Sequence, residues 1–196
     1  LRASLLFPYN RGLHFQHAVI QKLGNEGFTR VFRQAPVSTQ QILHPELYLK
    51  GVRPVHVPVP TLSEKRAWKE LAQGTVGEFD HAVLLEQYLS ASDAAQLAPS
   101  WRGGTFALME SKSTKGQVAL LYRSEWSDEE AAGRMFEAWK VALRARSKRV
   151  FEATTEKPHE IAGKFDHGYF RILLEGKRVT SVEGVATSHD IPRQVN

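Results

Sequence analysis

Residues 36–48, with the sequence PVSTQQILHPELY, predict two short helical turns separated by a corner. Ser38 and Gln41 have the spacing of a capping box, in which each side chain binds the backbone N–H of the other residue. Pro45 disfavours the α conformation at His44, and it can open the next helix because the first helical N–H has no partner anyway. We therefore expect a kink that holds the imidazole of His44 between two turns, with Tyr48 one turn further on.

The rest of the first hundred residues predicts helices joined by irregular stretches. Asn10 can cap a helix that places Phe15, Val19 and Leu23 on one face, because they recur every fourth residue. Residues 28–34 fit either a further helix or a short strand. Other helices are expected over 63–74, over 77–89, and in a short turn capped by Ser92 or Asp93.

The pattern becomes strand-like after the Trp-Arg-Gly-Gly segment at 101–104, whose glycine pair should make a tight chain reversal. A capping box at Ser127 and Glu130 starts a long helix with an apolar stripe that includes Met135 and Trp139. Strands are expected over 105–110, 117–122, 149–153, 169–174 and 178–183. The sequence thus predicts an α+β fold, with a helical segment over 1–100 and an α+β domain over 101–196. In that domain an antiparallel sheet packs against one long helix.

The composition is that of an ordinary globular protein, with 42% apolar and 24% charged residues among 196. No apolar run approaches the roughly 20 residues that span a bilayer, so no membrane span is expected. The absence of cysteine excludes disulfides and thiolate metal ligands. A net charge of +5 permits an anionic partner without requiring one. No signal peptide pattern is visible at the N-terminus, which leaves export and the compartment open.

Three other segments accompany the central one in a fixed order. They are FPYNRG at 7–12, Gly-Glu-Phe at 77–79 and Trp-Arg-Gly-Gly at 101–104. Together with residues 36–48 they resemble the segments of a group of bacterial zinc-metallopeptidase-like proteins, in which an H-E-x-x-H helix lies upstream. This chain contains no H-E-x-x-H, and it has Gln40 where the group has a glutamate.

The resemblance implies that the chain is the C-terminal portion of such a protein, without the zinc-binding helix. Residues 1–100 would then complete the wall of a peptidase-like domain, and residues 101–196 would be an accessory module facing a peptide substrate. Its partner would be the upstream part of the same polypeptide. Zinc would belong to the parent protein, and this chain alone is expected to bind no metal or cofactor and to cleave nothing.

His44 and Tyr48 are the candidate catalytic residues, because the resemblance suggests that they contact the substrate or its oxyanion beside the upstream metal. A histidine or tyrosine away from the metal can stabilise the oxyanion that forms when water attacks a peptide carbonyl. The alternative for His44 is a structural one, in which it binds a backbone carbonyl and locks the corner. Glu46 and Glu78 are expected to lie in the first turns of helices, where the helix dipole stabilises their negative charge.

Other titratable groups carry weaker signals. His14 and His17 lie one turn apart but lack a third ligand, and His167 beside Asp166 has no nucleophile motif nearby. No strand alternates aromatic and basic residues as an RNA-binding sheet does, so no nucleic acid partner is expected. The second functional hypothesis is a stand-alone, non-enzymatic binding domain for a protein or an anionic ligand.

Overall fold

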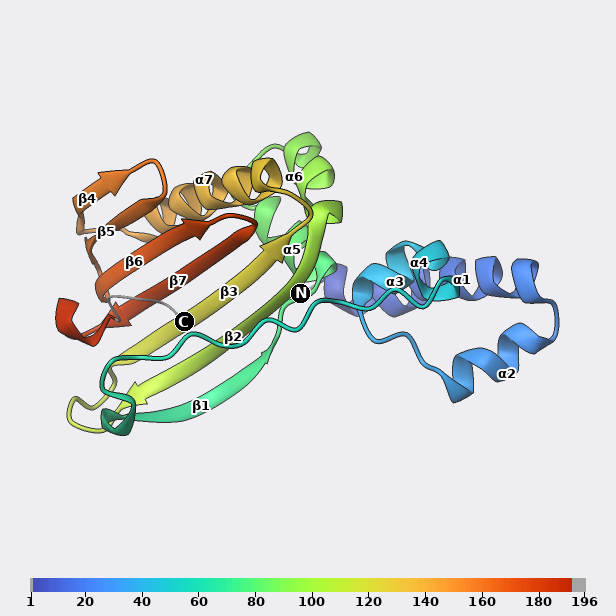
Figure 1. Cartoon of the computed structure of the whole chain (residues 1–196), viewed down its shortest axis with the longest axis horizontal. Coiled ribbons are helices and arrows are strands. Elements are labelled where there is room, and N and C mark those ends of the chain that lie inside the picture. The colour runs from blue at the N-terminus through green and yellow to red at the C-terminus, as the bar shows by residue number, and fades with distance from the viewer. Residues whose placement is uncertain (1, 192–196) are drawn as a thin grey trace.

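The computed structural model describes residues 2–191 and confirms the α+β class (Figure 1). A seven-stranded antiparallel sheet forms the body of the protein, and four helices form an arm that projects from one end of it. We call residues 2–51 the helical arm and residues 65–191 the sheet body. An extended segment, residues 52–62, connects the two and runs across the face of the sheet that lies toward the viewer in Figure 1.

The sheet has the strand order β1-β2-β3-β7-β6-β5-β4. Its strands are β1 (Trp68–Thr75), β2 (Trp101–Ser111), β3 (Val118–Trp126), β4 (Phe151–Lys157), β5 (Glu160–Phe165), β6 (Gly168–Glu175) and β7 (Arg178–Val185). The last four form a meander that starts at the far edge and returns to the centre, where Leu120 of β3 pairs with Glu183 of β7. The hairpin predicted around Glu175 and Gly176 is confirmed, and Gly176 takes the positive φ of 56° that its turn requires.

Helix α7 (Glu129–Arg146) covers the other face of the sheet, as the apolar stripe predicts. Asp128 caps it, rather than the expected Ser127, and accepts a hydrogen bond of 2.8 Å from the amide of Ala131. The predicted stripe is buried throughout, with Met135 fully enclosed. Beneath α7 lies the largest core cluster, which also takes Leu85 and Leu97 from two short helices.

Those short helices are α5 (Glu78–Leu85) and α6 (Ala91–Leu97), followed by the 3-10 turn η2 (Ala98–Ser100). Both pack with the sheet body, because they share its core. Residues 68–100, which the sequence groups with the helical N-terminal part, therefore lie with the sheet.

The prediction of a helix over 63–74 is wrong, since those residues form the 3-10 turn η1 (Lys65–Ala67) and then β1. Along β1 only Trp68 is buried, so the strand shows no alternation that would reveal it, and its pairing with β2 decides its conformation. Strand β5 was not expected either.

The glycine pair Gly103 and Gly104 does not reverse the chain but lies inside β2. A Cβ on Gly103 would collide with the carbonyl oxygen of Val55, and one on Gly104 would lie 2.8 Å from the carbonyl oxygen of Val76. Glycine is needed here because two other segments approach the strand closely.

The helical arm consists of α1 (Arg2–Leu23), α2 (Glu26–Arg33), α3 (Thr39–Leu43) and α4 (Pro45–Leu49). Helix α1 starts well before Asn10 and contains Pro8, so the predicted start is wrong, whereas its end before Gly24 is confirmed. The helical alternative holds for residues 28–33. Phe15, Val19 and Tyr48 form the small buried core of the arm. None of the helices in residues 2–191 combines the length and apolar character that crossing a bilayer requires.

Candidate functional site

The corner between α3 and α4 has the predicted kink. Ser38 caps α3 by accepting a hydrogen bond from the amide of Gln41, and His44 sits between the helices with φ −127° and ψ 79°. The return half of the capping box is displaced by one residue, because Oε1 of Gln41 accepts from the amide of Val37 at 2.8 Å. Pro45 opens α4 as its first residue. The imidazole of His44 is therefore held at a rigid turn.

His44 faces the first turn of α5, where its Nε2 lies 2.8 Å from Oε1 of Glu78. The side chain of Glu78 is 4% exposed and that of His44 is 32% exposed, so a buried carboxylate orients a half-buried imidazole. An ionised carboxylate can only accept, so Nε2 carries the hydrogen and the Nδ1 atom is left for other partners. The nearest carboxylate on that side is that of Glu46, whose Oε1 is 3.9 Å from Nδ1.

The second oxygen of Glu78, Oε2, is buried and has no hydrogen-bond partner among the described residues. Leaving a buried acceptor unpaired costs about 1–3 kcal/mol. A buried oxygen of this kind can accept from a donor that the described residues do not supply. The expectation that Glu78 serves only the helix dipole thus misses its contact with His44.

The segments that carry the resemblance meet at this junction. Phe7 of α1 packs on Phe79 with ring centroids 4.3 Å apart, and Oγ1 of Thr39 accepts from the amide of Phe79 at 3.3 Å. Gly77 has no room for a Cβ, which would collide with Thr39. In the Gly-Glu-Phe segment each residue therefore has a contact in the arm.

Gln40 joins the same junction to the Trp-Arg-Gly-Gly segment. Its side chain is 5% exposed, and Nε2 donates to the carbonyl of Trp101 at 2.8 Å and to that of Pro99 at 3.4 Å. A carboxylate in its place could not donate to either carbonyl. The amide at position 40 thus ties the arm to the sheet body.

The side chain of Tyr48 does not share a hydrogen-bond partner with that of His44. Its hydroxyl donates to the carbonyl of Gln34 at 2.8 Å, and its ring packs edge-on against Phe15 at 5.0 Å. The guanidinium of Arg30 lies 5.6 Å from the ring centroid. The structure places Tyr48 in the core of the arm, with its hydrogen bond directed away from the junction.

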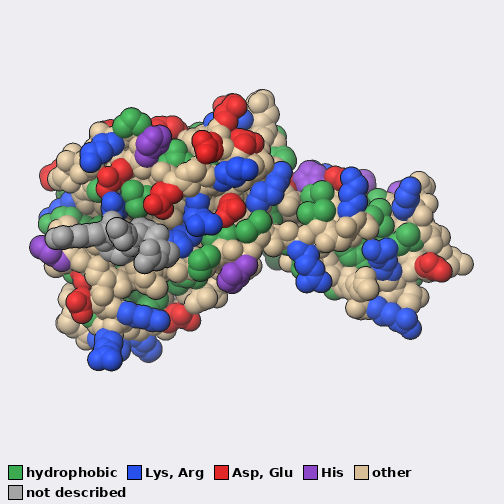
Figure 2. All heavy atoms as spheres, viewed as in Figure 1, with side chains coloured by type: hydrophobic (Ala, Val, Ile, Leu, Met, Phe, Trp, Pro, Cys, Tyr) green, Lys and Arg blue, Asp and Glu red, His purple; other side chains and the backbone are tan. Residues whose placement is uncertain are grey.

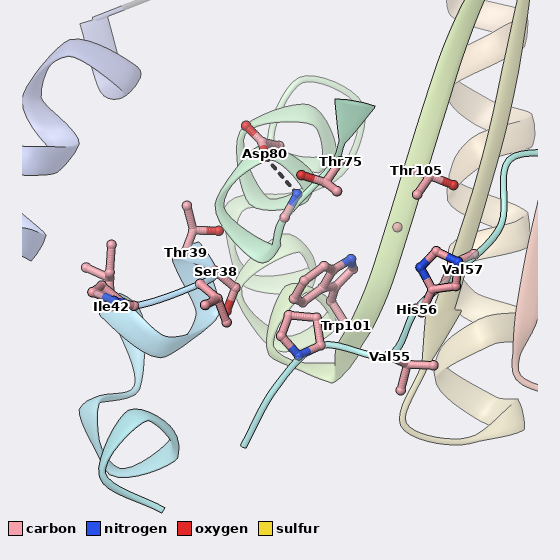
Figure 3. A pocket seen from close by; sticks show the side chains of 15 residues that line it. Ser38, Thr39, Ile42, Val55, His56, Val57, Thr75, Asp80, Trp101 and Thr105 are labelled. Atoms are coloured by element: carbon pink, nitrogen blue, oxygen red, sulfur yellow. Dashed lines mark hydrogen bonds between the residues drawn. The ribbon is translucent and has the colours of Figure 1, made fainter. Parts of the chain in front are cut away.

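A groove of about 410 Å³ opens beside the junction, between the arm, the connecting segment and the start of β2 (Figure 3). Figure 3 shows Trp101 at its centre, with Ser38 and Thr39 on one side and His56 and Thr105 on the other. Nε1 of Trp101 and Oγ1 of Thr105 are both buried without a partner among the described residues. Asp80 is fixed at the rim by accepting from the amide of Gly77 at 2.8 Å.

His81, which the sequence analysis does not single out, is the most buried histidine of the described chain. Its Nδ1 donates to the carbonyl of Gly77 at 2.8 Å, and its Nε2 accepts from the hydroxyl of Tyr122 at 2.6 Å. Burial lowers the pKa of His81 to about 4, and burial raises that of Tyr122 well above its usual value. This neutral histidine joins α5 to β3 and is a structural group. Only its position three residues after Glu78, on the same helix face, could have indicated it.

Among the remaining titratable candidates, Asp166 is bound by backbone amides. The carboxylate of Asp166 accepts from the amides of Val150, Lys148 and Arg149 at 2.6–2.9 Å, and these bonds hold the pKa of Asp166 below its usual value. His14 and His17 are exposed on α1. Within residues 2–191 no three His, Asp or Glu side chains are placed to hold a metal ion.

The fold and the junction define a class of α+β protein in which a seven-stranded antiparallel sheet, backed by one long helix, carries a helical arm with an oriented imidazole at its base. The chain belongs to the family described as "Domain of unknown function (DUF8575)", whose model matches residues 65–194. That range contains every strand, whereas the helical arm lies outside it. No curated protein and no solved structure matches the chain.

Proposed function

We propose that the chain is the C-terminal, non-metal-binding portion of a zinc-metallopeptidase-like protein. In this proposal the helical arm supplies part of the wall of a catalytic cleft, and the sheet body is an accessory module that faces a peptide substrate. The observation that carries the proposal is the imidazole of His44, which the buried Glu78 orients at 2.8 Å while leaving Nδ1 near the surface.

A carboxylate bound to one nitrogen of a histidine fixes the ring and its tautomer, so that the other nitrogen can act on a substrate or a metal. With Glu78 accepting from Nε2, the Nδ1 atom of His44 accepts a proton when the ring is neutral. When the ring is protonated, the same atom donates to a developing oxyanion. Tyr48 contributes by holding the arm in shape, since its hydroxyl is bound to Gln34.

An apolar stripe on α1 supports docking of the arm on the upstream part of the same polypeptide. Leu5, Tyr9 and Leu13 recur every fourth residue and are 64%, 75% and 69% exposed. They are exposed, whereas Phe15 and Val19 on the same helix are buried, so they add nothing to the core of the arm. Exposed apolar stripes of this kind mark contact surfaces.

The residues described here do not fit a zinc site of their own, because no three suitable side chains come together. In the proposal, zinc belongs to the upstream part of the parent protein.

The first experiment concerns the parent reading frame and its product. We expect an H-E-x-x-H helix to be encoded upstream of Leu1, and the longer protein to bind zinc and hydrolyse a peptide. In that protein His44→Ala should lower kcat about a hundredfold, the effect of removing one oxyanion donor, while the zinc content stays unchanged. Glu78→Gln should lower kcat less, because the ring is retained.

His17→Ala is the matched control, since His17 is an exposed histidine of the same arm. Its kcat should equal that of the unsubstituted protein. The proposal fails if no H-E-x-x-H precedes the chain, or if His44→Ala and His17→Ala have the same kcat. One tightly bound zinc ion per molecule of the present chain would also contradict it.

A further inference from the structure

The strongest unassigned feature is a basic pocket of about 320 Å³ on the helical arm, between α2 and the turn after α4. Arg30, Arg33 and Arg53 line it, together with Tyr48, and no aspartate or glutamate does. Figure 2 shows Lys and Arg side chains scattered over the visible face of the arm with few acidic ones between them. Residues 2–51 hold six Lys and Arg against two Glu, so the arm carries +4 of the total charge of +5.

The chain brings the three arginines together by local means. Arg30 and Arg33 lie one turn apart on α2, and Gly51 ends α4 with a positive φ of 70°. The amide of Val52 then donates to the carbonyl of Leu47 at 2.9 Å, which closes a helix-ending turn. This turn directs the chain back, and Arg53 joins the pocket from the other side.

The guanidinium of Arg30 is held in place, but its N–H donors are not all paired with acceptors. It lies over the ring of Tyr48, and one of its terminal nitrogens donates weakly to the carbonyl of Leu49 at 3.4 Å. Its Nε atom is buried and has no hydrogen-bond partner among the described residues. Arg30, Arg33 and Arg53 form no ion pair within residues 2–191, in contrast to Arg144 and Arg146 of the sheet body, which pair with Glu156 and Glu183.

Three like charges around one hollow repel each other, and a buried charged donor without an acceptor costs free energy. Both costs are removed when a multiply charged oxyanion enters, because guanidinium groups bind phosphate oxygens through paired N–H donors. The pocket is at the small end of the range of about 300–1,000 Å³ typical of ligand sites, so it suits a small ligand.

We propose that the pocket formed by Arg30, Arg33, Arg53 and Tyr48 binds the phosphate group of a small molecule. The proposal is independent of the metallopeptidase-like function, because it concerns this chain alone and a surface away from His44.

The test is a titration of the present chain with inorganic phosphate, methyl phosphate and acetate at constant ionic strength, followed by NMR of the arginine Nε–Hε and backbone amide signals. We expect saturable shifts at Arg30, Arg33 and Gly51 with phosphate or methyl phosphate, and much weaker binding of acetate. Tighter binding of methyl phosphate than of inorganic phosphate would identify an ester as the ligand, and the reverse would identify the free ion.

Arg33→Gln and Arg53→Gln should each weaken phosphate binding about tenfold, the usual effect of losing one charge-assisted interaction. Both side chains belong to exposed residues, so the variants should fold. Arg11→Gln removes an exposed cation of the arm that does not line the pocket, and it should change the dissociation constant less than twofold. Equal binding of acetate and phosphate, or equal weakening by Arg11→Gln and Arg53→Gln, would overturn the proposal.

Discussion

The helical arm and the sheet body bury their apolar residues to very different extents. The sheet body encloses a continuous core beneath α7 that contains Trp126, Phe136 and Phe170, each at most 1% exposed. The arm has only a small buried cluster around Phe15 and leaves Phe32 87% exposed. Because apolar burial is the main favourable term in folding, the body has the core of an independent domain, whereas the arm depends on what it contacts.

The two regions differ in charge as well. Nearly all of the net positive charge lies on the arm, whereas in the basic cluster at 144–149 of the body Arg144 and Arg146 pair with Glu156 and Glu183. The body therefore has the more extensive core, and the arm has the larger share of the net positive charge. Three predictions test this contrast.

Phe136→Ala should lower the free energy of unfolding of the sheet body by about 3–5 kcal/mol, because it leaves a cavity beneath α7. All four tryptophans lie in the sheet body, so tryptophan fluorescence during urea unfolding reports chiefly on that region. Phe15→Ala is the counterpart in the arm, where the ring is 2% exposed. It should reduce the helical circular dichroism signal while the fluorescence transition stays in place. Equal shifts of that transition by both variants would show that arm and body unfold as one unit.

His81 should make the sheet body sensitive to pH. Its pKa is about 4 in the folded state and 6.5 when exposed, so the unfolded state binds the proton first as the pH falls. The stability contributed by neutral His81 is present above pH 6.5 and is lost as the pH falls toward 4. The loss between pH 7.5 and pH 5 is about 2 kcal/mol.

Urea unfolding at pH 7.5 and pH 5 measures this loss. Asp128 and Asp166 have lowered pKa values, so the stability they contribute is lost only below pH 3.8 and does not interfere. In His81→Gln the difference between the two pH values should nearly vanish. An unchanged difference in that variant would assign the pH dependence to other groups.

Gln40→Glu should weaken the connection between the two regions by about 1–3 kcal/mol, because a carboxylate would face the carbonyls of Trp101 and Pro99 without a hydrogen to donate. Hydrogen exchange of the α3 amides should become faster, while exchange in β3 stays the same. Gln87→Glu is the matched control, since the amide of Gln87 donates to the carbonyl of Val83 at an exposed position. If the control accelerates exchange in α3 equally, Gln40 does not hold the junction.

Much of the fold follows from local patterns. Three features depend only on residues that are close together in sequence, and the structure contains all three. They are the stripe of α7, the hairpin around Gly176 and the kink at His44. Strand β1 could not be predicted, because an edge strand with one buried residue has no periodic signal. The glycine pair in β2 was misread, because its need for space comes from Val55 and Val76, which lie far away in sequence.

His44 and Tyr48 belong to one sequence segment, and their catalytic role stays a prediction. The structure separates the two side chains, since their hydrogen bonds lead to Glu78 and to Gln34. The sequence does not show which carboxylate 34 residues away meets the imidazole. For the same reason Arg30, Arg33 and Arg53 were not recognised as one pocket.

The α+β class, the corner at Pro45 and the long helix with its buried stripe follow from the amino-acid sequence, because backbone preferences and helical periodicity act over short distances. The pairing of β1 with the sheet, the burial of Glu78 against His44, and the approach of Arg30, Arg33 and Arg53 without an ion pair among the described residues all arise from the tertiary structure. Those features depend on which surfaces meet when the chain packs, and the balance of desolvation and pairing that governs them exists only after packing.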